Sequence, residues 1–204
     1  MLNIETAYKK VHKVFNEHRG DPHTEVEMRL GKFNGKMFDT NVGKETFEKI
    51  NDALMKYDGW EKILNTEEEV FYRDHDNIRM SVDESSGDRK VVHKISLHKE
   101  DFKKIKGAPL DMRFSVCKEV PVELDDFGVM DRKRTKTRRS FVRKNLSIDL
   151  TVSTGDAVDL DSEEMSEYQV EFEIIRPSEV KDAYQLMNII QKVNDLFKIF
   201  ENNK

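Results

Sequence analysis

Hydrophobic positions recur along the chain with two different periods, and the period indicates which element each segment forms. Residues 3–18 carry apolar side chains at helical spacing, and a Gly-Asp-Pro turn ends the pattern. A second helical stripe covers residues 43–57, and a broader apolar face runs over about residues 178–200. The spacing therefore predicts three amphipathic helices, and each of them needs an apolar surface to cover.

Between these segments, apolar and polar residues alternate with the period of two that is typical of β-strands. The run Ser85-Ser86-Gly87-Asp88 predicts a hairpin turn, and Ser153 begins a longer exposed loop that continues through acidic residues to Glu164. The pattern predicts eight strands, at residues 24–33, 67–74, 77–83, 89–98, 110–120, 133–143, 146–153 and 166–176. These connections favour an antiparallel sheet with helices outside it, an α+β class, and one domain over residues 1–204.

Composition narrows the function classes. Charged residues make up 37% of the 204 residues and the formal net charge is −5, so bulk charge does not indicate a nucleic-acid-binding protein. No run approaches the roughly 20 apolar residues of a membrane helix, and the single cysteine, Cys117, excludes an internal disulfide. We therefore expect a soluble, intracellular protein without membrane contact.

The polar faces of the predicted strands carry charges that are sorted by sign. Acidic pairs at i, i+2 occur in the first and last strands, and a basic triple with the same spacing occurs in a late strand: Glu25 and Glu27, Glu171 and Glu173, and Arg134, Lys136 and Arg138. Arg132 and Arg139 are expected outside that alternation or on the other side. In the simpler interpretation, all these faces point to solvent. Sorting by sign argues against it, because like charges in close array are destabilising and are usually interspersed.

A closed barrel with charged side chains inside and aliphatic side chains outside explains the sorting. The other predicted strands fit this arrangement, since Lys90, Lys94, Ser96 and His98 share one polar face. Clustered carboxylates are costly unless a cation neutralises them, and an all-oxygen site suits Mg²⁺ or Mn²⁺. Converging Arg and Lys side chains beside a divalent metal hold and activate a polyphosphate.

With these motifs in place, the sequence resembles the triphosphate tunnel metalloenzymes, in particular the RNA 5′-triphosphatases of fungal and large-DNA-virus mRNA capping systems. E-V-E-M-R at 25–29 resembles the first glutamate motif of the family, and V-E-F-E-I at 170–174 resembles the last. R-T-K-T-R at 134–138, I-D-L-T at 148–151 and R-F-S-V-C-K-E at 113–119 resemble strands between them. The chain departs from the pattern at Ser147, where an arginine is expected, and at Gln169, where a third glutamate can occur.

The resemblance implies a closed, eight-stranded triphosphate tunnel with a hydrophilic interior and helices outside. It also implies a role for each matching residue. Glu25, Glu27 and Glu173 would ligate Mg²⁺ or Mn²⁺, with Glu171 acting directly or through water. The triphosphate would be bound by Arg79, Lys94, Arg113, Arg134, Lys136 and Arg138, and these basic side chains would be oriented by Glu119, Asp149 and Thr151.

The implied function is hydrolysis of the γ-phosphate of triphosphate-ended RNA, the first step of mRNA capping. A guanylyltransferase would be the partner or a fused domain, and the resemblance fits nuclear, viral-factory and virion locations equally. Two alternatives stay open: a nucleoside triphosphatase or inorganic polyphosphatase of the same fold, and a non-catalytic binding or scaffolding module that retains the tunnel.

Overall fold

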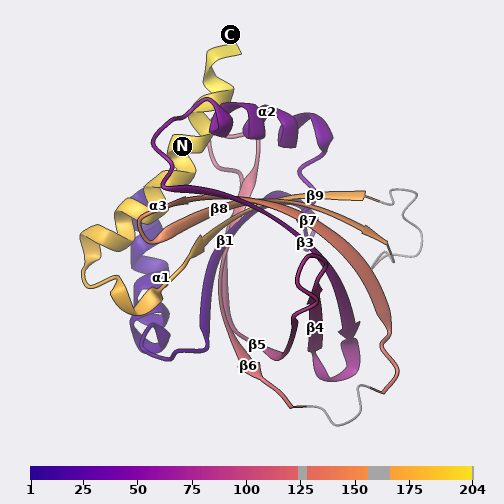
Figure 1. Ribbon diagram of the computed structural model, residues 1–204. Helices are drawn as coiled ribbons and strands as arrows, with labels where there is room; N and C mark the ends of the chain where they lie inside the picture. The colour runs from indigo at the N-terminus through magenta and orange to yellow at the C-terminus, as the bar shows by residue number, and fades with distance from the viewer. Residues whose placement is uncertain (124–127, 156–165, 204) are drawn as a thin grey trace.

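The computed structural model describes residues 1–123, 128–155 and 166–203, and its elements follow the expected order (Figure 1). The helices are α1 (Ile4–His18), α2 (Lys44–Met55) and α3 (Ala183–Phe197), with short 3-10 turns at Asp74–Asp76, Pro177–Glu179 and Lys198–Asn203. The strands are β1 (Thr24–Asn34), β2 (Met37–Asp39), β3 (Lys62–Arg73), β4 (Ile78–Asp83), β5 (Arg89–Phe102), β6 (Asp111–Pro121), β7 (Arg132–Arg143), β8 (Leu146–Gly155) and β9 (Ser166–Ile174). The predicted exposed loop does not begin at Ser153, which is buried in β8, and the part of that prediction from residue 156 to Glu164 lies outside the described residues.

Eight of the strands form a closed antiparallel barrel. Their order is β1-β6-β5-β4-β3-β7-β8-β9, and β9 pairs back onto β1 through Glu27 opposite Glu173 and Arg29 opposite Glu171. The prediction of a closed, eight-stranded barrel is therefore confirmed. The ninth strand of the described chain, β2, pairs only with the end of β1 and was missed, because three residues are too few to show an alternating pattern.

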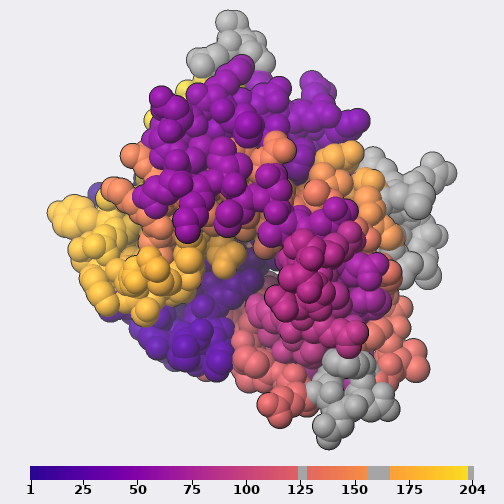
Figure 2. Space-filling view, in the orientation of Figure 1, coloured from indigo at the N-terminus to yellow at the C-terminus, as the bar shows by residue number. Residues whose placement is uncertain are grey.

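The hydrophobic core lies outside the barrel wall, between the strands and the helices. Val26, Met28 and Leu30 of β1 are fully buried on the outer face, whereas the charged residues between them face the interior. The same core includes apolar residues of β6, β8 and β9 and the inward faces of α1 and α3. These two helices lie side by side on one flank of the molecule, where the indigo and yellow-orange surfaces meet (Figure 2). The prediction that aliphatic faces point outward under helices is confirmed here.

Capping side chains fix the positions of these helices. The Asn3 side chain accepts a hydrogen bond from Thr6 N at 2.8 Å and begins α1, and Asp182 does the same for α3 with Gln185 N at 2.9 Å. Buried Asn194 of α3 accepts from Leu2 N and donates to Leu2 O. The N-terminal residues are thus held against the last helix. No helix in the described ranges is long and apolar enough to cross a membrane.

Four predictions about the strands need correction. Strand β3 begins at Lys62 rather than at residue 67, and β5 continues to Phe102 rather than ending at residue 98. A bulge in β5 between Ser96 and His98 shifts the register, so that His98 lies opposite outward-facing Val116 and not on the interior face. Arg132 has the same parity as Arg134 in β7 and lies on its interior face, opposite Tyr72.

Candidate active site in the barrel interior

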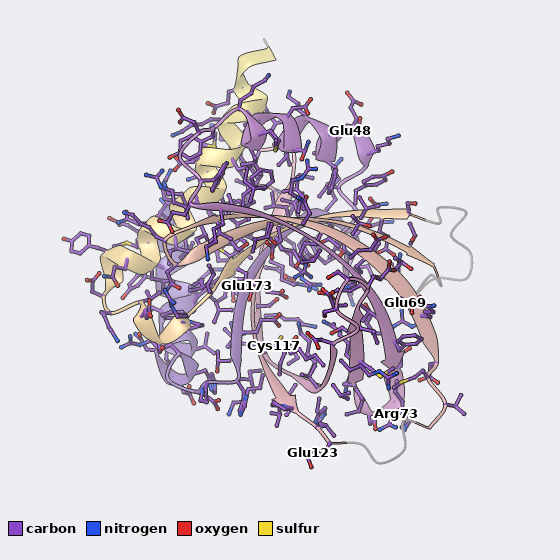
Figure 3. All side chains as sticks on the ribbon, in the orientation of Figure 1. Glu48, Glu69, Arg73, Cys117, Glu123 and Glu173 are labelled. Carbon is purple, nitrogen blue, oxygen red and sulfur yellow. The ribbon has the colours of Figure 1, made fainter. Side chains whose placement is uncertain are left out.

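The pairing register brings the sorted charges together inside the barrel. Residues that lie opposite each other on neighbouring strands share a face, so Glu27 and Glu173 face the interior together, as do Arg29 and Arg113. Figure 3 shows Glu173 and Cys117 within the barrel and Glu48 on α2 outside it. The interior faces of β1, β6, β7, β8 and β9 therefore form one polar site.

The acidic part of this site is crowded with like charges. Glu27 is 6% exposed, and its neighbours Glu25 and Glu173 are mostly enclosed. Burial, followed by repulsion from Asp149, Glu25 and Glu27, raises the pKa of Glu173 to about 7. Burial and the charge of Glu27 raise the pKa of Glu25 as well, although Lys94 forms an ion pair with it. This part of the site holds more negative charge than its own cations offset.

Arg29 bridges Glu27 of this group and Glu171. The Arg29 Nε atom forms ion pairs with Glu27 Oε1 at 2.9 Å and with Glu171 Oε1 at 3.0 Å, but its geometry is not that of a hydrogen bond to either. The Arg29 Nη2 atom donates a hydrogen bond to Glu27 Oε2 at 3.2 Å. Burial alone would raise the pKa of Glu171, but Arg29 and Arg138 outweigh it and lower that pKa to about 2. Within the described ranges, no three Asp, Glu, His or Cys side chains are arranged to hold a metal ion. The register places Glu27 opposite Glu173, but the expected ligands do not form a metal-binding group in this arrangement, and Arg29 is paired with both Glu27 and Glu171.

The basic residues of β7 face the same interior, and β8 lies between β7 and the acidic strand β9. Arg134 is 4% exposed and donates to Glu167 Oε1 at 2.6 Å and to Ser153 O at 3.0 Å. Arg138 donates through Nε to Thr151 Oγ1 at 3.3 Å, and its Nη1 lies 3.8 Å from Asp149 Oδ2. The expected contacts of Asp149 and Thr151 with a basic side chain are therefore present, and both are made to Arg138.

Lys136, the middle residue of the basic triple, lies in a different environment. Burial lowers its pKa despite the opposing influence of Tyr72. Its ammonium lies 5.9 Å from the Tyr72 ring centre. An anion bound beside Lys136 would favour its charged form and raise this pKa again.

Glu119 contacts three basic side chains of β4 and β5. Its carboxylate lies 2.7 Å from Lys90, 3.6 Å from Lys94 and 3.9 Å from Arg79. Burial by itself raises the pKa of Glu119, but the hydrogen bond from Lys90 and the charge of Lys94 lower it overall. The structure thus places Glu119 where it orients the two predicted phosphate-binding residues Arg79 and Lys94.

Arg113 lines the same cavity as Arg79 and Lys94 but is held by a different carboxylate. Its Nε donates to Asp101 Oδ1 at 2.6 Å and its Nη2 donates to Asp101 Oδ2 at 3.0 Å. Sequence reasoning missed Asp101, because the bulge in β5 moves it onto the interior face. It also left out Arg29, Glu167 and Tyr72, although their positions in alternating segments carried a signal.

Comparison with known proteins places the chain in a family. The family model described as mRNA capping enzyme, beta chain, matches residues 37–204. The chain belongs to this family. The E-V-E-M-R segment at 25–29 precedes the matched range, but it forms barrel strand β1. No curated protein matches the chain.

Solved structures with the same fold include those of the S. pombe Pct1 RNA triphosphatase. One of them has a TM-score of 0.75 at 17% sequence identity. A second, in complex with the Spt5 CTD, has a TM-score of 0.78 at 18% sequence identity. Each match covers 94% of this chain and 92% of the other. A structure of the Schizosaccharomyces pombe Mediator head module is also similar, with a TM-score of 0.51 at 10% sequence identity. This match covers 87% of this chain and 95% of the other. At these identities the likeness shows the tunnel fold.

Proposed function

We propose that the chain is a metal-dependent RNA 5′-triphosphatase that removes the γ-phosphate from triphosphate-ended RNA in the first step of mRNA capping. One observation carries this proposal: the basic residues of β7 and the acidic pairs of β1 and β9 all face the interior of one closed barrel. Membership of the mRNA capping enzyme beta-chain family supports the choice of substrate. A guanylyltransferase, on this or another chain, would then act on the diphosphate end that is produced.

The donor set fits Mg²⁺ or Mn²⁺ at the acidic group. Glu25, Glu27 and Glu173 supply carboxylate oxygens only, which are the ligands that these hard cations prefer. The raised pKa values of Glu25 and Glu173 support the proposal that a cation binds here. Glu171 is the weaker candidate ligand, because two arginines, Arg29 and Arg138, act on it together and hold its pKa at about 2. When bound, the cation would offset the charge of the terminal phosphate and polarise its P–O bonds.

The chain's own residues would bind and orient the triphosphate. Lys136 and Arg138 of β7, with Arg79 and Lys94 from the opposite strands, would contact phosphate oxygens and offset the charge that develops on the transferring group. Arg138 is held by Thr151 and Asp149, so its planar fork is positioned before substrate binds. Water would attack the γ-phosphorus in line, and the diphosphate end would leave.

A nucleoside triphosphatase or inorganic polyphosphatase is the second candidate, because all the cationic contacts at this site suit phosphate rather than a base. Phosphate release from triphosphate-ended RNA, ATP and tripolyphosphate, each with Mg²⁺, Mn²⁺ or a chelator, tests the proposal. Metal-dependent γ-phosphate release from RNA with the highest kcat/KM is expected. A folded protein that binds triphosphate-ended RNA but releases no phosphate with either metal would instead be a binding module.

A further inference from the structure

The barrel interior opens at one end into a cavity that is strongly basic. This cavity, of about 330 Å³, lies where β1, β3 and β5 end and where β4, β6 and β7 begin. Its lining includes seven Lys or Arg residues and two acidic ones: Arg29, Arg73, Arg79, Lys94, Lys99, Arg113 and Arg132 against Glu27 and Asp74. Some of these cations are paired with carboxylates, as Lys94 is with Glu25 and Arg79 is with Glu119. The excess of basic side chains in the lining still attracts a polyanionic chain to the cavity.

Two side chains with planar groups, Phe38 and Arg113, contact each other in the lining of this cavity. Phe38, from the strand β2 outside the barrel, lines the cavity together with Arg113. The Arg113 guanidinium carbon lies 4.6 Å from the centre of the Phe38 ring. The two hydrogen bonds that Arg113 donates to Asp101 hold the guanidinium in place beside the Phe38 ring, so Arg113 and Phe38 together form a fixed stacking platform.

Gly31 makes this platform possible. A Cβ at this position would lie 2.2 Å from Asp39 O and 2.9 Å from the Phe38 Cζ atom, closer than either atom tolerates. The missing side chain lets β2 approach β1 and lets the Phe38 ring fold over the end of the barrel. The platform is thus built by a backbone feature of β1 and does not depend on a mobile loop.

We propose that this platform and the neighbouring Lys99 bind the first nucleotides of single-stranded RNA, so that RNA leaves the tunnel through the basic end with its triphosphate inside. The proposal rests on the proposed function and deepens it, because it distinguishes RNA from free triphosphates. Unpaired bases stack on aromatic rings and guanidinium planes whatever their sequence. Lys99 is exposed, lies opposite interior-facing Ser115, and can pair with a backbone phosphate.

The three possible substrates would use the platform to different extents. A triphosphate-ended RNA offers bases and further phosphates beyond the triphosphate, a nucleoside triphosphate offers one base, and tripolyphosphate offers none. Loss of the platform should therefore affect RNA most and tripolyphosphate least. The residues that bind the triphosphate itself should affect all three substrates together.

The experiment compares Phe38→Ala with Met37→Ala, its neighbour on β2, which is 68% exposed. We measure kcat/KM for a triphosphate-ended RNA of ten nucleotides, for ATP and for tripolyphosphate. Phe38→Ala should lower the ratio of RNA to tripolyphosphate by about tenfold, mainly through KM, as expected for one stacked base. Met37→Ala should leave that ratio unchanged. Phe38→Leu, which keeps apolar packing against Gly31 but loses the ring, should behave like Phe38→Ala.

A second measurement does not depend on catalysis. Fluorescence anisotropy of a labelled, triphosphate-ended RNA should show that Phe38→Ala binds the RNA more weakly than the wild type. The affinity of Lys99→Ala should depend less on salt concentration than that of the wild type. Lys32→Ala, on the outer face of β1, should keep the salt dependence of the wild type. Equal losses for RNA and tripolyphosphate in Phe38→Ala would overturn the inference. Wild-type protein that binds RNA through Phe38 without releasing phosphate would overturn the proposed function and leave the inference standing.

Discussion

The inner and outer faces of the barrel wall use the same strands for opposite purposes. On β1, Met28 packs fully buried under the helices, whereas the adjacent Glu27 contributes its carboxylate to the crowded interior. On β7, Arg138 faces Thr151 and Asp149 inside, whereas Arg139 donates outside to Asn51 of α2 at 2.8 Å and to Asn65 of β3 at 3.0 Å. Outer residues therefore stabilise the barrel wall, whereas inner residues line the site that a ligand would occupy. Neighbouring substitutions should therefore separate stability from activity.

The largest effect on stability is expected on the outer face. Met28→Ala removes a fully buried side chain from the core and should lower the free energy of unfolding by about 2–5 kcal/mol. Activity per folded molecule should change little at a temperature well below the unfolding midpoint. Denaturant titration together with phosphate release measures both quantities. A folded Met28→Ala protein of unchanged stability would show that the helices do not complete the core.

The inner neighbour of Met28 should show the converse. Glu27→Ala or Glu173→Ala removes a proposed metal ligand and should lower metal-dependent phosphate release by at least about 100-fold. The protein should stay folded, because each substitution relieves repulsion among carboxylates. Glu67→Ala, on the exposed outer face of β3, is the matched control and should retain activity. Near-normal turnover of either folded mutant would remove these residues from the metal site.

The pair Arg138 and Arg139 tests the comparison on one strand at equal change in charge. Arg138→Ala should lower the rate by about 100-fold, or about 3 kcal/mol, if its contact with phosphate strengthens in the transition state. Arg138→Lys should recover only part, since an ammonium cannot reproduce the planar fork. Arg139→Ala should retain activity and lose about 1 kcal/mol of stability with its hydrogen bonds. We measure phosphate release at fixed ionic strength and check folding by circular dichroism. Equal rates for the two alanine mutants would show that activity does not depend on which face of β7 carries the arginine.

The smallest effect is expected from a residue that only positions another. Thr151→Val keeps the shape of a buried side chain and removes the acceptor for Arg138 Nε. The rate should fall by about fivefold, corresponding to about 1 kcal/mol, with most of the change in kcat. The double mutant with Arg138→Ala should be no slower than Arg138→Ala alone. Additive losses would show that Thr151 acts separately from Arg138.

The sequence by itself determined which residues face inward on most strands. Side chains alternate across a strand whatever it pairs with, so the parity of Glu25 and Glu27, of Glu171 and Glu173, and of the basic triple follows from local geometry. Sorting by sign then required an interior, because the outer side of each strand was already apolar. Helix positions followed in the same way from the period of the apolar residues.

Only the tertiary structure decided which charges meet. Arg29 neutralises Glu171 because β9 closes onto β1, a pairing of residues more than 140 positions apart in the chain that no local pattern encodes. The bulge in β5 reverses parity after Ser96, which turns His98 outward and brings Asp101 to Arg113. Strand β2 and its Phe38 depend on Gly31 in the same way, because a close approach of two backbones is a property of the folded wall and leaves no periodic trace in the sequence.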